Sequence, residues 1–143
     1  MSITQTLTNV FKQDCLDGAQ NLGTSGDTIK IALYTSSATL NASTTAYTTS
    51  NEVSGTGYTA GGTTLSSQSV TLDTTNGVAF FDAADPSFTS ATITARGALS
   101  YNNSKSNAAI AVLDFGSDFS SSNGTFQVQF PTAAHNTALI RIS

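Results

Sequence analysis

The spacing of apolar residues changes once along this chain, and the change limits the folds that are open to it. In residues 3–15 apolar side chains recur every three or four positions, which places them on one face of an amphipathic helix. From Thr28 onward they recur at every second position, beginning with Ile29, Ile31 and Leu33. A period of two is typical of a β-strand with one buried face. We therefore expect a mainly β protein with one helix at the N-terminus.

The expected helix occupies residues 1–18. The Ser2 hydroxyl could cap its N-terminus by accepting a hydrogen bond from a backbone N–H, and Gly18 would end it. A helix of this length is only marginally stable alone, so its apolar face should dock on the rest of the protein. We expect Cys15, which lies on this face, to be packed and unreactive. The face comprises Ile3, Leu7, Val10, Phe11 and Cys15.

Six further runs show the two-residue period, and turn-forming residues separate them. Asn76-Gly77, between two of these runs, predicts a β-hairpin with a type I′ turn. Short strands at this spacing are typical of antiparallel sandwiches and barrels. We predict a single domain, residues 1–143, in which residues 28–35 and 68–143 form an antiparallel β-sandwich of six to eight strands. The runs are 69–73, 78–82, 91–101, 109–115, 125–130 and 138–142.

Residues 36–67 interrupt the alternation with a long stretch of Ser, Thr, Ala, Asn and Gly that holds few apolar residues. A loop of this length in a compact domain is usually functional, partly disordered or ordered by another chain. It is either a mobile surface excursion or an arm that lies across a partner subunit, and its spaced apolar anchors favour the arm slightly. The candidate partner contacts, from the arm and the helix, are Leu40, Tyr47, Val53, Tyr58, Leu7 and Phe11.

The chain carries few charges, and this excludes several classes of partner. Only 10% of residues are charged, against roughly 25% in an average protein. Ser and Thr together occupy 44 of the 143 positions. The net charge of −4 argues against nucleic acid, which requires clustered Lys and Arg.

No run resembles a secretory signal or a membrane span, so we expect a protein made in a cytoplasm that binds no membrane.

No motif predicts a catalytic, cofactor-binding or metal site. Gly55–Gly62 lacks both the dinucleotide-binding spacing and the Lys of a phosphate loop, so its glycines are expected to serve turns and close packing. His135 has no nucleophile motif to act with, and we interpret it as a loop residue. Arg96 stands inside an apolar strand, where it could pair with an acid across the sheet, lie at a subunit contact or face solvent.

Four aspartates at turns leave one question about ions open. Asp82 and Asp85 flank one turn, and Asp114 and Asp118 flank another. Two such turns could meet and share a Ca²⁺ ion, although none of these residues stands in a calcium-loop motif. Aspartate is also common in turns for structural reasons. The sequence therefore predicts no metal site but allows an ion at these turns.

The order and spacing of five sequence blocks resemble a family of small structural proteins of tailed bacteriophages. Together the blocks cover most of residues 29–143. They are Asn51–Gly62, Val70–Asp73, Ala91–Leu99, Ala111–Gly116 and Phe126–Pro131.

The resemblance implies a non-enzymatic protein of the virion, assembled in the cytoplasm of a bacterial host. The first expectation is a capsid decoration (cement) protein that binds the major capsid protein, and the second is a neck, tail or fibre-anchoring component. A homo-oligomer is expected, with a trimer favoured. A carbohydrate-binding module or adhesin is the alternative from another class, but the chain has no Trp and little aromatic surface for stacking sugars.

Overall fold

A computed structural model describes residues 2–142, which form one helix and ten strands. The helix α1 spans Asn9–Asp17. Seven of the strands have four or more residues, in agreement with the predicted six to eight. The strands are β1 (Thr6–Leu7), β2 (Ile29–Tyr34), β3 (Thr63–Thr64), β4 (Ser69–Asp73), β5 (Val78–Asp82), β6 (Ser87–Ala91), β7 (Thr94–Asn102), β8 (Ala108–Ser120), β9 (Gly124–Gln127) and β10 (Ile140–Ile142).

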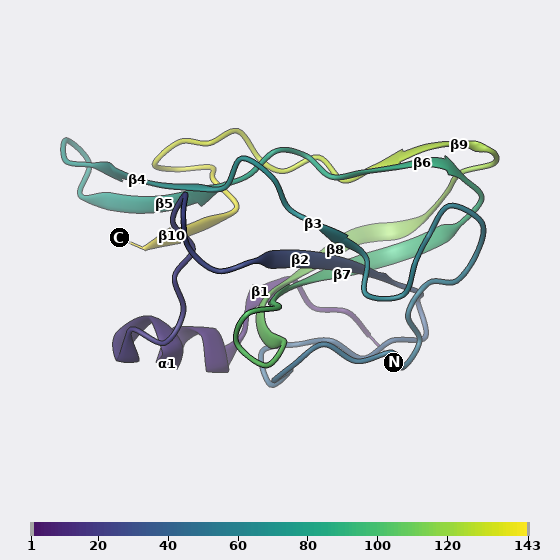
Figure 1. The fold of residues 1–143 in the computed structure, drawn as a ribbon, viewed down its shortest axis with the longest axis horizontal. Coiled ribbons are helices and arrows are strands. Elements are labelled where there is room, and N and C mark those ends of the chain that lie inside the picture. Colours follow the sequence, from purple (N-terminus) through teal and green to yellow (C-terminus); the bar gives the residue numbers. More distant parts are fainter. Residues whose placement is uncertain (1, 143) are drawn as a thin grey trace.

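All strand pairs within the three sheets are antiparallel, which confirms the predicted mainly β fold. The largest sheet has five strands in the order β1-β8-β7-β2-β3. A three-stranded sheet, β10-β5-β4, and a two-stranded sheet, β6-β9, lie along one side of it (Figure 1). Helix α1 and the first part of the segment 36–67 lie on its opposite side (Figure 1). The molecule is therefore a β-sandwich with additional chain packed against its outer face.

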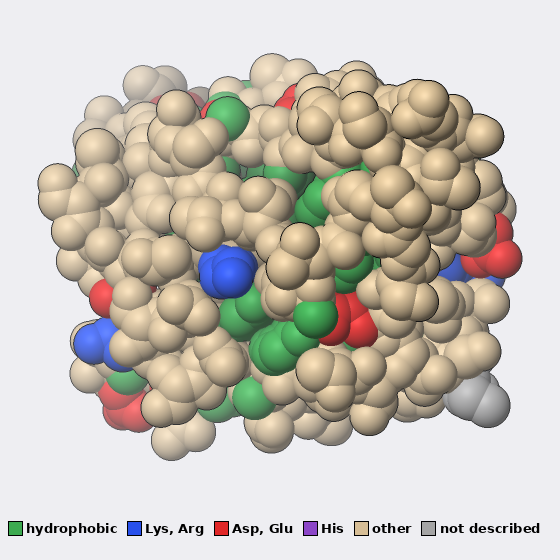
Figure 2. Space-filling model, turned by 45° about the vertical axis from the view of Figure 1, so that its right-hand side comes forward, with side chains coloured by type: hydrophobic (Ala, Val, Ile, Leu, Met, Phe, Trp, Pro, Cys, Tyr) green, Lys and Arg blue, Asp and Glu red, His purple; other side chains and the backbone are tan. Residues whose placement is uncertain are grey.

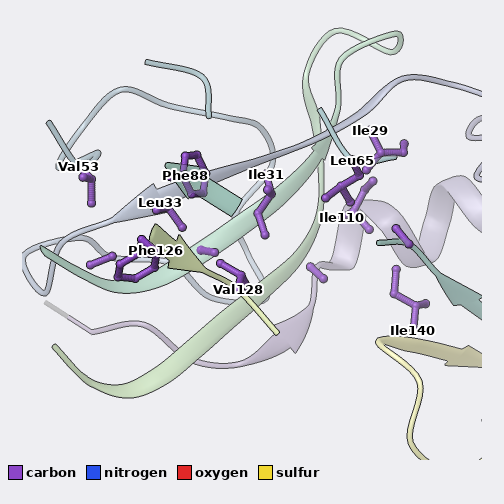
Figure 3. Close-up of a cluster of buried hydrophobic side chains, with 14 of the residues drawn as sticks. Ile29, Ile31, Leu33, Val53, Leu65, Phe88, Ile110, Phe126, Val128 and Ile140 are labelled. Atoms are coloured by element: carbon purple, nitrogen blue, oxygen red, sulfur yellow. The ribbon is translucent and has the colours of Figure 1, made fainter. Parts of the chain in front are cut away.

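The five-stranded sheet is buried on both faces. On one face, side chains of β2, β7 and β8 pack against the second layer in the larger hydrophobic cluster, where Ile31 and Leu33 lie near Phe88 and Phe126 (Figure 3). On the other face lies a second cluster, built from the sheet, the N-terminal residues and the segment 36–67. Its buried members are Ile3, Ala32, Tyr34, Ala38, Leu40, Leu99, Tyr101, Ala109 and Val112.

The N-terminal helix is shorter than the predicted 1–18. It begins after Thr8, whose hydroxyl accepts a hydrogen bond from the Phe11 N–H, and it ends at Gly18 as expected. The prediction of Ser2 as the cap is wrong, because the residues before Thr8 are extended and pair with other segments. Ile3 forms a parallel bridge with Leu40, and β1 pairs with β8. Backbone partners from distant segments override the local helical pattern.

The apolar face of α1 is less buried than the spacing predicted. Phe11 is the buried residue of α1. Cys15 is exposed, which corrects the expectation of a packed thiol, and Leu16 is 92% exposed. Cys15 lines an open apolar groove between α1 and the strands β4, β5 and β10.

The strands after the helix follow the predicted pattern closely. Strands β4 and β5 coincide with the predicted runs. The predicted strand 91–101 begins later, at Thr94 in β7, and β6 lies almost wholly outside the predicted runs. The Asn76-Gly77 hairpin forms, but four residues separate Asp73 from Val78 and only Gly77 among them has a positive φ. A type I′ turn needs two positive φ angles in sequence, so that turn type is wrong.

Segment 36–67 is not a free arm, and this corrects the expectation that a partner orders it. Its backbone pairs with its own domain at several points: Leu40 with Ile3, Ala46 with Ala108, and Glu52 with Tyr34. It ends in β3, which pairs with β2. The cause is the second apolar face of the sheet, which must be covered and for which this segment supplies the cover.

Gly62 shows how closely segment 36–67 lies on the sheet. Its φ is +77°, and a Cβ added there would overlap the backbone carbonyl of Ile31 in β2. The expectation that these glycines serve close packing is confirmed at this position.

We predict that Gly62→Ala strongly destabilises the protein. A left-handed φ costs an alanine about 1–2 kcal/mol, and overpacking against backbone adds roughly 1–3 kcal/mol. Gly77→Ala is the matched control, because Gly77 has a φ of +67° and nothing within 4 Å of the added Cβ. Urea denaturation of both variants measures the difference. Equal losses of stability would contradict the close contact.

Candidate functional site

Glu52 is the only glutamate in the chain, and its carboxylate holds the middle of segment 36–67 in place. It accepts hydrogen bonds from the hydroxyl of Tyr47 at 2.7 Å, the hydroxyl of Tyr58 at 2.6 Å and the backbone N–H of Gly61 at 2.8 Å. The Tyr58 hydroxyl in turn accepts from the Leu33 N–H of β2 at 2.9 Å. One carboxylate therefore joins three points of the segment and, through Tyr58, the central sheet.

The remaining two tyrosines of the chain bind the same region. The Tyr34 hydroxyl donates to the carbonyl of Thr48 and the Tyr101 hydroxyl to the carbonyl of Gly61, both at 2.6 Å. The ring of Tyr47 stacks on that of Tyr101, with centroids 4.8 Å apart. Burial, and then the hydrogen bond to Glu52, raise the pKa of Tyr47 and of Tyr58 well above the usual value. Burial also raises the pKa of Tyr34 and of Tyr101.

Three of the six predicted partner contacts are buried within the chain, which corrects their assignment. Leu40, Val53 and Phe11 are at most 4% exposed and pack in the two clusters, so none offers surface to another protein. Tyr47, Tyr58 and Leu7 are half-buried and pack against the same clusters. Their apolar side chains mark where the segment and the N-terminus bind their own sheet. The tyrosines also form no exposed platform of the kind that would stack a sugar.

A long groove that the sequence did not predict runs along the open side of the sandwich. We call it the open-side groove. It consists of two adjoining hollows that share Phe115, Val128 and Gln129. One wall is β8, and the other is the chain from β9 to β10. Its lining is 5–7, 111–115, 119–121, 125–131 and 136–141.

The groove exists because the outer edge of β8 is only partly paired. On that side Ala46 bridges to Ala108 and β1 pairs with Ala111 and Val112, and in the described part of the chain no strand pairs with β8 beyond Val112. Across the gap, β9 pairs with β6 on its other side. Backbone edges and part of the core between the layers therefore face solvent together.

Aromatic side chains line one end of the groove. Phe115 packs against Phe119 with centroids 6.4 Å apart and against Phe126 with centroids 6.3 Å apart. Phe126 is buried, Phe115 is half-buried, and Phe119 is 52% exposed. Phe119 therefore extends the apolar lining of the groove to the surface of the molecule. The alternation of Leu113, Phe115 and Phe119 is visible in the sequence, but only the missing neighbour strand exposes it.

Arg96 resolves the alternatives left open for it by pairing across the sheet. Its Nε lies 3.2 Å from Oδ1 of Asp114 on the adjacent strand β8. Both side chains are about a third exposed, so the pair contributes roughly 0–1 kcal/mol. The Asp114 carboxylate also accepts from the Gly116 N–H at 2.9 Å. This pair fixes the rim of the groove where β8 leaves the cover of β1.

Of the two predicted aspartate turns, the second is wrong, because Asp114 and Asp118 both lie within β8. Among residues 2–142, no three His, Cys, Asp or Glu side chains lie close enough to hold a metal ion. Asp85 accepts a hydrogen bond from the Phe130 N–H at 2.9 Å, and Asp114 is paired with Arg96. Among the described residues, the structure therefore gives no support to an ion shared by Asp82, Asp85, Asp114 and Asp118.

His135 lies beside the end of β4. Its Nδ1 lies 3.5 Å from Oδ2 of Asp73, at the end of β4. Its carbonyl accepts a hydrogen bond from Arg141 at 3.3 Å.

The only helix in residues 2–142 is α1, and it is too short to cross a membrane.

Comparison with known proteins adds no relative: no protein-family model, curated protein or solved structure matches this chain.

We predict that Glu52→Gln lowers the free energy of unfolding by about 1–3 kcal/mol, the usual cost of leaving a buried polar group without its partner. The amide nitrogen cannot accept from Tyr58 or from the Gly61 N–H. Asp118→Asn, at an exposed position, is the matched control and should change stability by less than roughly 0.5 kcal/mol. Urea denaturation decides between them. A Glu52→Gln variant as stable as this control would contradict the role of the carboxylate.

We predict that the protein unfolds at alkaline pH together with ionisation of its tyrosines. The pKa of each tyrosine is raised in the folded state, so the neutral phenols stabilise the fold below the ordinary pKa of 10.0, and this contribution falls as pH rises above it. Tyrosinate absorbance and the circular dichroism of the β-sheet should change together above pH 10. Reversible ionisation near pH 10 with unchanged circular dichroism would refute the network.

Proposed function

We propose that this chain is a non-enzymatic structural component of a tailed-bacteriophage particle, and that it acts as a capsid decoration protein on the outside of the shell. The observation that carries the proposal is the open-side groove, an extended apolar contact surface with Phe119 exposed at its end. The sequence blocks that resemble small phage structural proteins support it. The proposed partner is the major capsid protein.

The shape of the groove fits an extended segment of that partner. A strand added at the outer edge of β8 would pair with its free backbone groups and would displace the side chains of Gln5 and Asp114, which accept from the Asp114 and Gly116 N–H groups. Its apolar side chains would meet Leu113, Phe115 and Phe119. Such a contact uses the surface of a rigid domain and needs no deep pocket, which suits a protein repeated over a symmetric shell.

The neutral surface of the chain also fits this role. Most of the face shown in Figure 2 is neither charged nor hydrophobic, and the hydrophobic side chains gather along a hollow between polar ridges. Low charge reduces repulsion between copies crowded on a shell, and it makes their binding weakly dependent on salt. A decoration protein benefits from both properties.

The second candidate within the same class is a neck, tail or fibre-anchoring component. The two differ in copy number, which quantitative mass spectrometry of particles of the phage that carries this gene would measure. Hundreds of copies per particle, in a simple ratio to the major capsid protein, would support decoration. About a dozen copies would move the protein to the neck or tail. Absence from purified particles would refute both.

We predict that Phe119→Lys prevents binding to particles that lack this protein. An introduced ammonium group would have to leave water inside an apolar contact, and this costs several kcal/mol unless it is paired. Leu16→Lys is the control, because Leu16 is exposed on α1, outside the groove. Co-sedimentation of each purified variant with the particles measures binding. Loss of binding in the control, or none in Phe119→Lys, would contradict the groove as the contact.

A further inference from the structure

Strand β4 forms an uncovered edge of the three-stranded sheet. Its pairing partner is β5, and the order β10-β5-β4 leaves its other side without a neighbour. Within residues 2–142, Ser69–Asp73 makes no backbone hydrogen bond outside this sheet. The β4–β5 hairpin also lies at one end of the molecule, far from β9 along its longest axis (Figure 1). The edge is therefore accessible to another chain.

The edge lacks the features that usually keep such a strand from pairing with another chain. Strands at sheet edges commonly carry Lys, Pro or a bulge. Strand β4 has none of these, and its single charge is Asp73 at its end. Val70 is 51% exposed and Leu72 is 66% exposed, both on the same face of the sheet. Across the sheet, Ile142 on β10 extends this exposed apolar face.

We infer that β4 pairs with β4 of a second copy of this chain, antiparallel and about a two-fold axis at Thr71. A two-fold axis perpendicular to the sheet makes the contact self-complementary. In this register Val70 lies opposite Leu72 of the other copy, and Leu72 lies opposite its Val70. Directly opposed residues share a face, so the four apolar side chains form one cross-strand cluster. The two three-stranded sheets become one sheet of six strands.

Charge placement disfavours registers whose axis lies closer to Asp73, and the apposition of Val70 with Leu72 favours the axis at Thr71. With Thr71 on the axis, Asp73 lies opposite Ser69 of the other copy. The two Asp73 carboxylates are then four residues apart, about 14 Å along the strands at a rise of roughly 3.4 Å per residue. This exceeds the Debye length of about 10 Å at 0.1 M salt, so their repulsion is screened. Moving the axis toward Asp73 shortens both the overlap and the distance between the carboxylates.

The register can be tested by disulfide formation between copies. In a Cys15→Ser background, Thr71→Cys places two thiols directly opposite each other, with Cα atoms roughly 4.5–5.5 Å apart, which suits a disulfide. Ser69→Cys, at the other end of the overlap, is the matched control because its two copies would lie about 14 Å apart. With oxidised glutathione as electron acceptor, we expect most of the Thr71→Cys chain to become a covalent dimer and the control to stay monomeric. Equal cross-linking of both variants would overturn the register.

The contact itself can be tested by charge. Val70→Lys/Leu72→Lys brings introduced ammonium groups face to face across the axis. By sedimentation equilibrium we expect the wild-type mass, twice the 14.7 kDa of one chain, to halve in this variant. An equal mixture with Val70→Glu/Leu72→Glu should restore the doubled mass. Both positions are half exposed or more, and circular dichroism verifies that the variants fold.

The remaining outcomes overturn the inference. A wild-type chain that is monomeric at every concentration would do so, because the partner would then be a different protein. So would a trimer, the oligomer favoured from the sequence, whose mass the lysine variant leaves unchanged. Phe119→Lys should retain the doubled mass, since it lies in the open-side groove. Failure of particle binding and failure of self-association are therefore separate results.

Discussion

Burial of the five-stranded sheet on both faces is the constraint on which the rest of this structure depends. Five of the six residues of β2 are buried, and so are seven of the nine in β7. A second β-layer can cover only one of these faces. The other needs chain that is neither helix nor sheet, long enough to cross it and apolar at a few points. Residues 36–62 meet that need, and this explains why a compact domain contains so long an irregular segment.

Backbone bridges hold the irregular cover at several points, and side chains add hydrogen bonds between these points. Among these side chains, the carboxylate of Glu52 accepts from Tyr47 and Tyr58, and the hydroxyls of Tyr34 and Tyr101 donate to backbone carbonyls of the cover. Tyrosine suits the task because its ring packs in the cluster while its hydroxyl reaches a polar partner. The raised tyrosine pKa values are a consequence of this arrangement, and they mark a structural network rather than a site of proton transfer.

Much of the fold could be predicted from the sequence, because the two-residue period and the turn residues are local signals. Strands β4 and β5 were placed without error on that basis, and the mid-strand position of Arg96 indicated a possible pair across the sheet. Predictions that depended on distant chain were less successful. Residues 3–7 show a helical spacing but pair with Leu40 and β8. The apolar anchors of segment 36–67 look like partner contacts, because the two-residue period does not reveal the second apolar face of the sheet, which these anchors cover. The open-side groove likewise follows from the short length of β1, which no local pattern reports.

The two accessible sheet edges differ in what they offer a partner. The open-side groove joins a free edge to part of the core, with Phe119 at its end, and an extended foreign segment could fill it. Strand β4 offers a short edge with a self-complementary pattern, which suits a second copy of the same chain. Strands β4 and β9 lie toward opposite ends of the molecule (Figure 1), and residues of β9 line the groove together with Phe119, so one contact does not block the other. A chain with this arrangement can bind a shell and link neighbouring copies at the same time, and its low charge favours both contacts by limiting repulsion between copies.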